Sequence, residues 1–135
     1  MRKELAEKIY QRCPIIYRGV NDGPKKNLMC FGFECSSGWF EMIFMLSEAV
    51  EKLAREKQRQ GIDEEELPIV IQVKEKFGGL RFYVQNSSEE VNDLIAMAEQ
   101  SSYGICEICG AAGGLMKAGP VMMTRCQKHM RSFQD

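Results

Sequence analysis

Two short motifs near the C-terminus have the residue types and the spacing of a metal site. Cys106 and Cys109 form a C-x2-C pair, and Cys126 and His129 form a C-x2-H pair separated from the first by 16 residues. Zn2+ prefers four thiolate and imidazole ligands in a tetrahedral arrangement, and a two-residue gap lets both side chains of a tight turn point at one ion. His129 is the single histidine of the chain. The sequence therefore predicts one Zn2+ ion bound by these four residues.

The predicted site has the features of a structural site. Four protein ligands close the coordination shell, whereas catalytic zinc keeps a position for water. No Glu follows the ligands in an H-x-E or H-E-x-x-H arrangement, and we expect Glu107 to point to solvent. An iron–sulfur cluster fits less well because it usually takes four cysteines, and four unrelated side chains are the simplest alternative. We expect the ion to hold a C-terminal module, residues 104–135, against a domain of residues 1–103.

Cys13, Cys30 and Cys35 lie outside these motifs. They could form a second site completed by Asp22 or Glu34, or they could be buried free thiols. Cys30 and Cys35 have opposite strand parity, which disfavours a shared ion unless a bulge intervenes. Because zinc takes the only histidine, no base is left for a Cys–His or Ser–His–Asp arrangement, and we expect the protein not to be an enzyme.

Composition narrows the class of protein. The chain has 135 residues, of which 44% are hydrophobic and 27% charged, as in a globular domain with its own core. A net charge of -1 argues against a general binder of nucleic acids or anionic membranes. The charged N-terminus has no apolar segment typical of a signal peptide, and no apolar run is long enough to span a membrane. We therefore expect a cytoplasmic protein, where paired cysteines more often bind metal than form disulfides.

Hydrophobic periodicity predicts the elements that must position the motifs. We expect a helix at about Lys3–Arg12, a strand at Leu28–Cys35 and a long amphipathic helix at Trp39–Gln60. Ser87 and Glu90 offer a capping box ahead of a further helix. These elements predict an α+β fold in which the long helix covers a small antiparallel sheet, with a C-terminal zinc-finger-like module.

The segment PIVIQVKEKFGGLRFYV predicts a hairpin. Gly78-Gly79 can supply the positive φ angles of a two-residue turn between two strands. The pairs expected on one face are Phe77–Leu80, Glu75–Phe82 and Val73–Val84, and those on the other are Lys76–Arg81 and Lys74–Tyr83. This second face points outward and supplies the candidate partner-binding residues Lys74, Lys76, Arg81 and Tyr83. An ordinary solvated face is the alternative interpretation.

Three segments carry a resemblance to a known group of proteins. CFGFECSSGW, QVKEKFGGLRFYV and AEQSSYGICEICG, with the closing CQKH, resemble a family of small proteins common in phages and prophage regions. The likeness runs from about Cys30 to His129. It implies a zinc-bearing α+β domain in a phage or bacterial cytoplasmic setting, and it implies no reaction. Relatives tend to have an acidic residue before Gly-Trp, where this chain has Ser36-Ser37.

Two hypotheses for function follow. The first is an accessory factor that binds a host or phage protein, and that inhibits a defence or nucleic-acid enzyme. The second is a nucleic-acid binder that combines the basic hairpin face with the four basic residues near the zinc motif, which are Lys117, Arg125, Lys128 and Arg131. Residues 104–133 contain one Glu, so the local charge is about +2 once three thiolates and Zn2+ are included. That excess is modest, and we favour protein binding.

Overall fold

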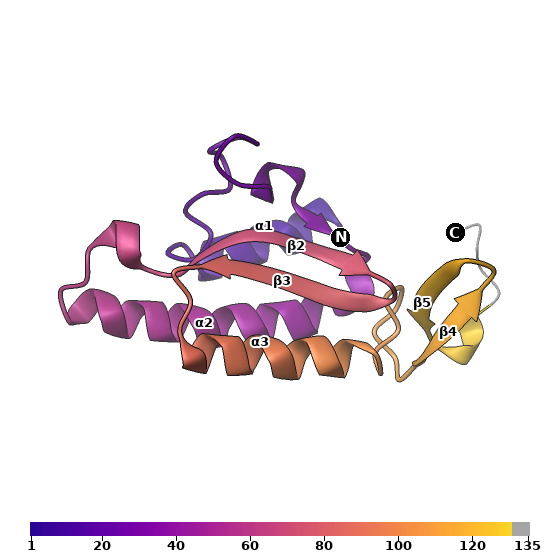
Figure 1. Ribbon diagram of the computed structural model, residues 1–135. Coiled ribbons are helices and arrows are strands. Elements are labelled where there is room, and N and C mark those ends of the chain that lie inside the picture. Colours follow the sequence, from indigo (N-terminus) through magenta and orange to yellow (C-terminus); the bar gives the residue numbers. More distant parts are fainter. Residues whose placement is uncertain (131–135) are drawn as a thin grey trace.

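A computed structural model describes residues 1–130 of the chain, in which helices and strands are interspersed along the sequence (Figure 1). The helices are α1 (Lys3–Arg12), α2 (Phe40–Arg59) and α3 (Glu89–Ser102). The strands are β1 (Phe33–Glu34), β2 (Ile69–Lys76), β3 (Gly79–Gln85), β4 (Gly114–Ala118) and β5 (Val121–Arg125). The α+β class is confirmed, as are the first helix and the long helix, whose ends lie within one residue of those expected.

The main sheet has the order β1-β2-β3. β2 and β3 are antiparallel, as predicted, but β1 runs parallel to β2, with Phe33 beside Val73. The expectation of a wholly antiparallel sheet was therefore wrong. The strand expected at Leu28–Cys35 is also much shorter, because its first part forms a 3-10 turn at Met29–Phe31. Asn27 favours this turn, since its side-chain oxygen accepts a hydrogen bond from the Met29 amide at 2.8 Å.

The hairpin turns one residue earlier than expected. Phe77 and Gly78 are its two central residues, with φ angles of 53° and 85°, so that Lys76 pairs with Gly79 and Glu75 with Leu80. Glu75 stabilises the turn by accepting a hydrogen bond from the Gly78 amide at 2.6 Å. The partner of each predicted strand residue shifts by two positions. Because a shift of two preserves strand parity, each face keeps its predicted side chains, except Phe77, which lies in the turn.

α3 covers the outer edge of β3. Ser102 Oγ accepts a hydrogen bond from the Leu80 amide at 2.9 Å, and Glu99 Oε2 accepts one from the Phe82 amide at 3.0 Å. These side chains occupy donors that a further strand could otherwise use. The helix is capped by Ser88, which accepts a hydrogen bond from Val91 N, so the box predicted to begin at Ser87 starts one residue too early.

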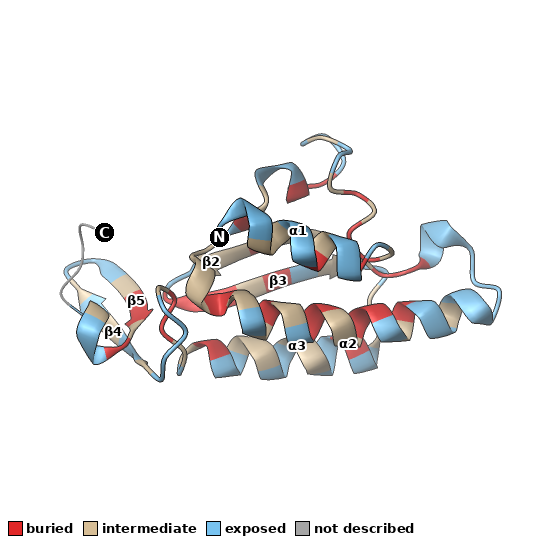
Figure 2. Ribbon diagram, turned by 180° about the vertical axis from the view of Figure 1, so that it is seen from behind, coloured by how far each residue is buried: buried red, intermediate tan, exposed pale blue. Residues whose placement is uncertain are grey.

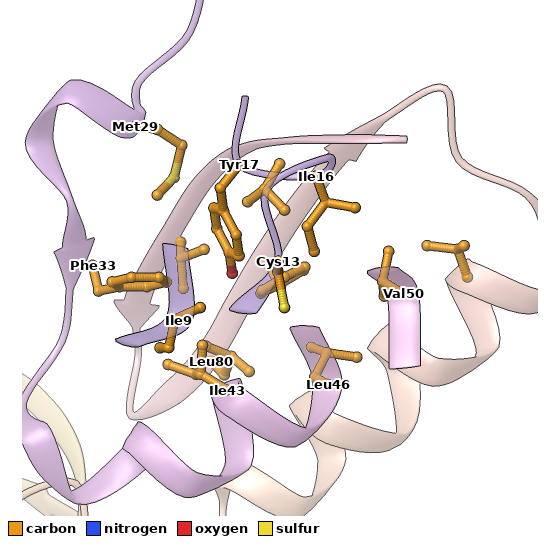
Figure 3. Packing of buried hydrophobic residues seen from close by; sticks show 14 of the residues in the cluster. Ile9, Cys13, Ile16, Tyr17, Met29, Phe33, Ile43, Leu46, Val50 and Leu80 are labelled. Atoms are coloured by element: carbon orange, nitrogen blue, oxygen red, sulfur yellow. The ribbon is translucent and has the colours of Figure 1, made fainter. Parts of the chain in front are cut away.

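The core lies between one face of the main sheet and the three helices. Figure 3 shows Ile9 of α1, Ile43 of α2 and Leu80 of β3 meeting at its centre. Figure 2 shows buried residues recurring along α2, whose last turns are exposed. In Figure 1, α1 lies behind the strands, on the core side of the sheet. The other face of the sheet is not crossed by any helix of residues 1–130. Within the same residues, no helix is long and apolar enough to cross a membrane.

One buried carboxylate ties the N-terminal segment to α2. Glu51 accepts hydrogen bonds from the amides of Ile15 and Ile16, at 3.1 and 3.0 Å, and also pairs with Arg55 at 3.5 Å. These two amides follow the end of α1, where the chain has no helical partner for them. Glu51 therefore satisfies backbone donors that the core would otherwise leave unpaired.

Replacing Glu51 with Ala should lower the free energy of unfolding by about 2–5 kcal/mol, because one buried amide, one partly buried amide and one cation lose their partner. Glu51→Gln keeps one carbonyl acceptor and should cost less. Glu56→Ala, on an exposed turn of the same helix, is the matched control and should change the stability by less than about 0.5 kcal/mol. Chemical denaturation measures all three; equal losses for Glu51→Ala and Glu56→Ala would contradict this role.

Candidate metal centre

The structure brings together the four residues that the sequence predicts as ligands. The ligand atoms of Cys106, Cys109, Cys126 and His129 all lie within 4.8 Å of one another. Sγ of Cys109 lies 3.7 Å from Sγ of Cys126, and Nδ1 of His129 lies 3.7 Å from Sγ of Cys106 and 3.1 Å from Sγ of Cys126. A disulfide needs sulfur atoms about 2.05 Å apart. The four side chains are therefore close enough to bind one metal ion.

A short turn and a small hairpin produce this convergence. Gly110 N donates to the Cys106 carbonyl at 2.9 Å and closes the first turn, with Gly110 at a φ of 81°. β4 and β5 then pair antiparallel, from Gly114 opposite Arg125 to Ala118 opposite Val121, and return the chain to its starting point. One further turn, closed by the His129 amide on the Cys126 carbonyl at 3.0 Å, places the imidazole beside the Cys126 sulfur.

Backbone amides prepare one of the thiols for metal binding. Burial acts to raise the pKa of Cys106, but N–H groups of Cys109, Cys126 and Ile108 directed at its sulfur lower that pKa to about 6. At neutral pH the Cys106 side chain is therefore largely a thiolate, which is the form that ligates metals.

The first cysteine turn packs against the start of α2. The Gly38 amide donates to the Glu107 carbonyl at 2.8 Å, and a Cβ at Gly38 would overlap the carbonyl oxygens of Cys106 and Glu107. Trp39 Nε1 donates to the Ile105 carbonyl at 2.9 Å. Because only glycine leaves room for this approach, the Gly-Trp pair serves as the docking point for the metal turn.

Glu107 corrects a prediction from sequence. It was expected to point to solvent, but only 8% of the residue is exposed, and its Oε2 accepts a hydrogen bond from the Ser36 amide at 2.8 Å. Nothing in the sequence around Glu107, which lies between two ligands, indicates that its side chain accepts this hydrogen bond. Its partner lies in the Ser36–Trp39 turn, far away in the sequence, and only the folded chain shows the contact.

The β2–β3 turn makes a second contact with the module. Thr124 of β5 is buried, and its hydroxyl donates to the Gly78 carbonyl at 2.6 Å. A Cβ at Gly78 would meet the Leu115 side chain of β4. The module therefore contacts the domain at two places, the start of α2 and the β2–β3 turn, which lie at the same end of the main sheet (Figure 1).

The remaining cysteines are separate from the cluster. Among residues 1–130, the four ligands form the only group of at least three Cys, His, Asp or Glu side chains close enough to hold an ion. The pKa of Cys13 and the pKa of Cys35 are both raised to about 12, and the main cause is desolvation of the thiol. Cys30 is exposed. Cys13, which is buried, and Cys35, which is half-buried, are therefore protonated at neutral pH.

The candidate partner-binding residues lie on one surface. Lys74 pairs with Arg81, and Tyr83 pairs with Gln72, on the face of β2 and β3 away from the helices. Glu34 of β1 joins this face, since Gln72 Nε2 donates to it at 3.4 Å. We call the surface the open sheet face, made up of Glu34, Gln72, Lys74, Lys76, Arg81 and Tyr83.

The basic residues of the module differ in how accessible their charges are. Lys117 and Lys128 are exposed, but Nε and Nη1 of Arg125 are buried. Arg131 lies outside the described residues. On the open sheet face itself, Arg81 is held by the Leu80 carbonyl at 2.8 Å and by the Tyr103 hydroxyl at 3.3 Å.

Comparisons with models of protein families, with curated proteins and with solved structures find no match to this chain. The likeness to small phage proteins remains a prediction from the sequence motifs. The cluster and its contacts therefore carry the functional argument.

Thiol counting tests the assignment of the six cysteines. In the native, metal-loaded protein, a small alkylating reagent at about pH 8 should modify Cys30 alone. Cys13 is buried, Cys35 is half-buried, both thiols are protonated, and metal protects the other three. After chelation the count should rise to four, and after denaturation to six. Mass spectrometry of the modified protein gives these counts. Modification of Cys13 in the native protein, or an unchanged count after chelation, would contradict the assignment.

Proposed function

We propose that the cluster binds one Zn2+ ion with a structural role, and that the protein acts by binding another protein through its open sheet face. For zinc, the support is the donor set of three thiolates and one imidazole, which suits its tetrahedral preference. Zn–S bonds of about 2.3 Å and Zn–N bonds of about 2.0–2.1 Å give ligand separations of about 3.6–3.8 Å in a tetrahedron. Two of the separations described above are 3.7 Å, and the Cys126–His129 pair is closer.

We assign no catalytic role to this zinc ion. Four protein ligands leave no coordination position for water or substrate. The turn that bears two of them is also fastened to Ser36, Gly38 and Trp39 by its backbone and by Glu107. Such a site is suited to holding the module in place on the domain.

The observation that carries the binding proposal is the open sheet face. Lys74, Lys76 and Arg81 lie on the same face of the sheet as the exposed Tyr83, and Glu34 is the one acidic residue of this surface. Arg and Tyr are enriched at protein interfaces because they combine large contact areas with directed hydrogen bonds. The strands that carry these side chains, β2 and β3, are hydrogen-bonded to β1 on one side and to side chains of α3 on the other.

The same surface suits an acidic protein better than a nucleic acid. Its net charge is about +2, which is small beside the several phosphates that a nucleic-acid site must neutralise. Arg81 is already bound to Leu80 and Tyr103, and Arg125 turns part of its guanidinium inward. On the motif resemblance alone, we propose that the partner is a host or phage protein in a bacterial cell, and that binding inhibits it.

Metal analysis tests the zinc proposal. The purified protein should contain one Zn2+ per chain, and Cys126→Ser should lose the ion together with the folded state of the module, since binding and folding are coupled there. Cys13→Ser is the matched control, because Cys13 lies in the core and outside the cluster, and it should keep the ion. A zinc content near zero, or a Cys126→Ser protein with full zinc and stability, would refute the site.

Charge reversal tests the open sheet face. Lys74→Glu with Lys76→Glu should abolish capture of the partner from host lysate, and should change the free energy of unfolding by less than about 1 kcal/mol. Lys25→Glu with Lys26→Glu makes the same charge change on an exposed loop and should leave capture intact. Capture that depends on nuclease-sensitive material and falls steeply with salt would favour the nucleic-acid alternative instead.

A further inference from the structure

An apolar groove runs between α2 and α3 and ends at the metal turn. Its volume is about 790 Å3, and it is lined mainly by Met42, Met45, Leu94 and Met97, with Ile105 and Gly110 at one end. The two helices lie side by side below the main sheet in Figure 1, and none of the residues that line the groove belongs to the open sheet face. The groove is therefore separate from the surface in the proposed function.

Two of the lining side chains expose much of their apolar surface. Met45 is 69% exposed and Met97 is 68% exposed. Methionine is flexible and polarisable, so neighbouring methionines on two helices make a surface that adapts to apolar side chains of a partner. An exposed apolar hollow of this kind, bordered by charged residues, is typical of a binding site for a protein segment.

The charges of the groove walls indicate what this segment should look like. The two walls, residues 40–49 of α2 and Glu89–Ser102 of α3, hold six acidic residues and no Lys or Arg. All 18 basic residues lie outside these walls, together with the other 13 acidic ones. The one basic residue that lines the groove is Arg2, whose side chain lies 3.8 Å from the carboxylate of Glu4. Glu48 is paired with Arg12, and Glu99 accepts from the Phe82 amide. The other four are exposed: Glu41 lines the groove, and Glu89, Glu90 and Asp93 lie on α3 beside the residues that line it.

We infer that this groove binds an amphipathic helix of a partner protein whose apolar stripe is flanked by Lys or Arg. The apolar side chains enter between Met45 and Met97, and the flanking cations meet the exposed carboxylates of the walls. The α2 wall of ten residues is about 15 Å long, which matches a partner helix of about three turns with anchors at i, i+3 or i+4, and i+7.

The excess of carboxylates on the two helices disfavours two other occupants. A second copy of the chain, docked groove to groove, would bring two acidic surfaces together, each with Glu41 in its groove. Like charges in apposition cost binding energy. Anionic lipid headgroups would meet the same repulsion. A cationic amphipathic helix satisfies both the apolar floor and the acidic rim.

A synthetic helix tests this inference on the full-length, metal-loaded protein. The probe is a fluorescent peptide of about 14 residues made of Leu and Lys, with Leu on one helical face. Fluorescence anisotropy should show saturable binding that weakens as salt is added, and circular dichroism should show a gain of helix. A peptide of the same composition with a scrambled order, and one with Glu in place of Lys, should each bind at least about tenfold more weakly.

Matched variants locate the binding site. Met45→Ser with Met97→Ser should weaken binding at least about tenfold, and because both residues are mostly exposed the protein should stay folded. Phe31→Ser, at a position 61% exposed and outside the groove, should bind normally, as should Lys74→Glu with Lys76→Glu. These last variants keep failure here distinct from failure of the open sheet face.

Several results would overturn the inference. Absence of binding, equal binding of the scrambled peptide, or unchanged binding by the methionine variant would each do so. Sedimentation that reveals a dimer abolished by Met45→Ser with Met97→Ser would show that a second copy occupies the groove instead. Binding to anionic lipid vesicles that depends on the same two methionines would assign the groove to a membrane surface.

Discussion

The approach of the Cys106–Glu107 backbone to Gly38 is the contact on which the arrangement of this protein depends. A side chain at Gly38 would overlap both carbonyl oxygens, so the metal turn can reach the start of α2 only because this residue is glycine. Trp39, which follows directly, is fully buried in the core and also donates to Ile105. One short turn therefore joins the core of the domain to the module that bears the metal ligands.

The module also forms one end of each of the two surfaces that we propose for binding. Its strand β5 holds the β2–β3 turn through Thr124 and Gly78, and so fixes the end of the open sheet face. Its first cysteine turn supplies Cys109 and Gly110 to the end of the groove between α2 and α3. The net charge of -1 does not reveal the difference between these surfaces, because the open sheet face has three basic residues and one acidic residue, whereas the groove walls have six acidic residues and no basic one. Two surfaces of opposite charge would allow one small domain to contact two partners.

Local patterns predicted those parts of the fold that local interactions determine. The stripe beginning at Trp39 predicted α2 to within one residue, and the two-residue gaps in the cysteine motifs predicted a cluster that the structure confirms. Helical periodicity and ligand spacing are both set by a few neighbouring residues, so one sequence is enough to read them.

The predictions that failed depend on contacts between distant segments. Gly78-Gly79 looked like the centre of the turn, but Gly79 is needed where the Tyr103 ring packs against the strand, and Phe77 takes the positive φ instead. Glu107 looked solvent-exposed because its partner, the Ser36 amide, is 71 residues away. β1 proved parallel to β2 because the chain crosses over through α2 between them. None of these contacts has a signal within a short window of sequence.

Hydrogen exchange on metal-loaded and metal-free protein tests most directly whether the ion fastens the module to the domain. Removal of the ion should speed exchange of the Gly38 amide and the Trp39 indole N–H, because both donate to carbonyls of the metal turn. The amides shared between β2 and β3 should keep their protection and serve as the internal reference. Fast exchange at Gly38 only in the metal-free protein is the predicted result. A Gly38 amide that stays protected after complete removal of the ion would contradict the account.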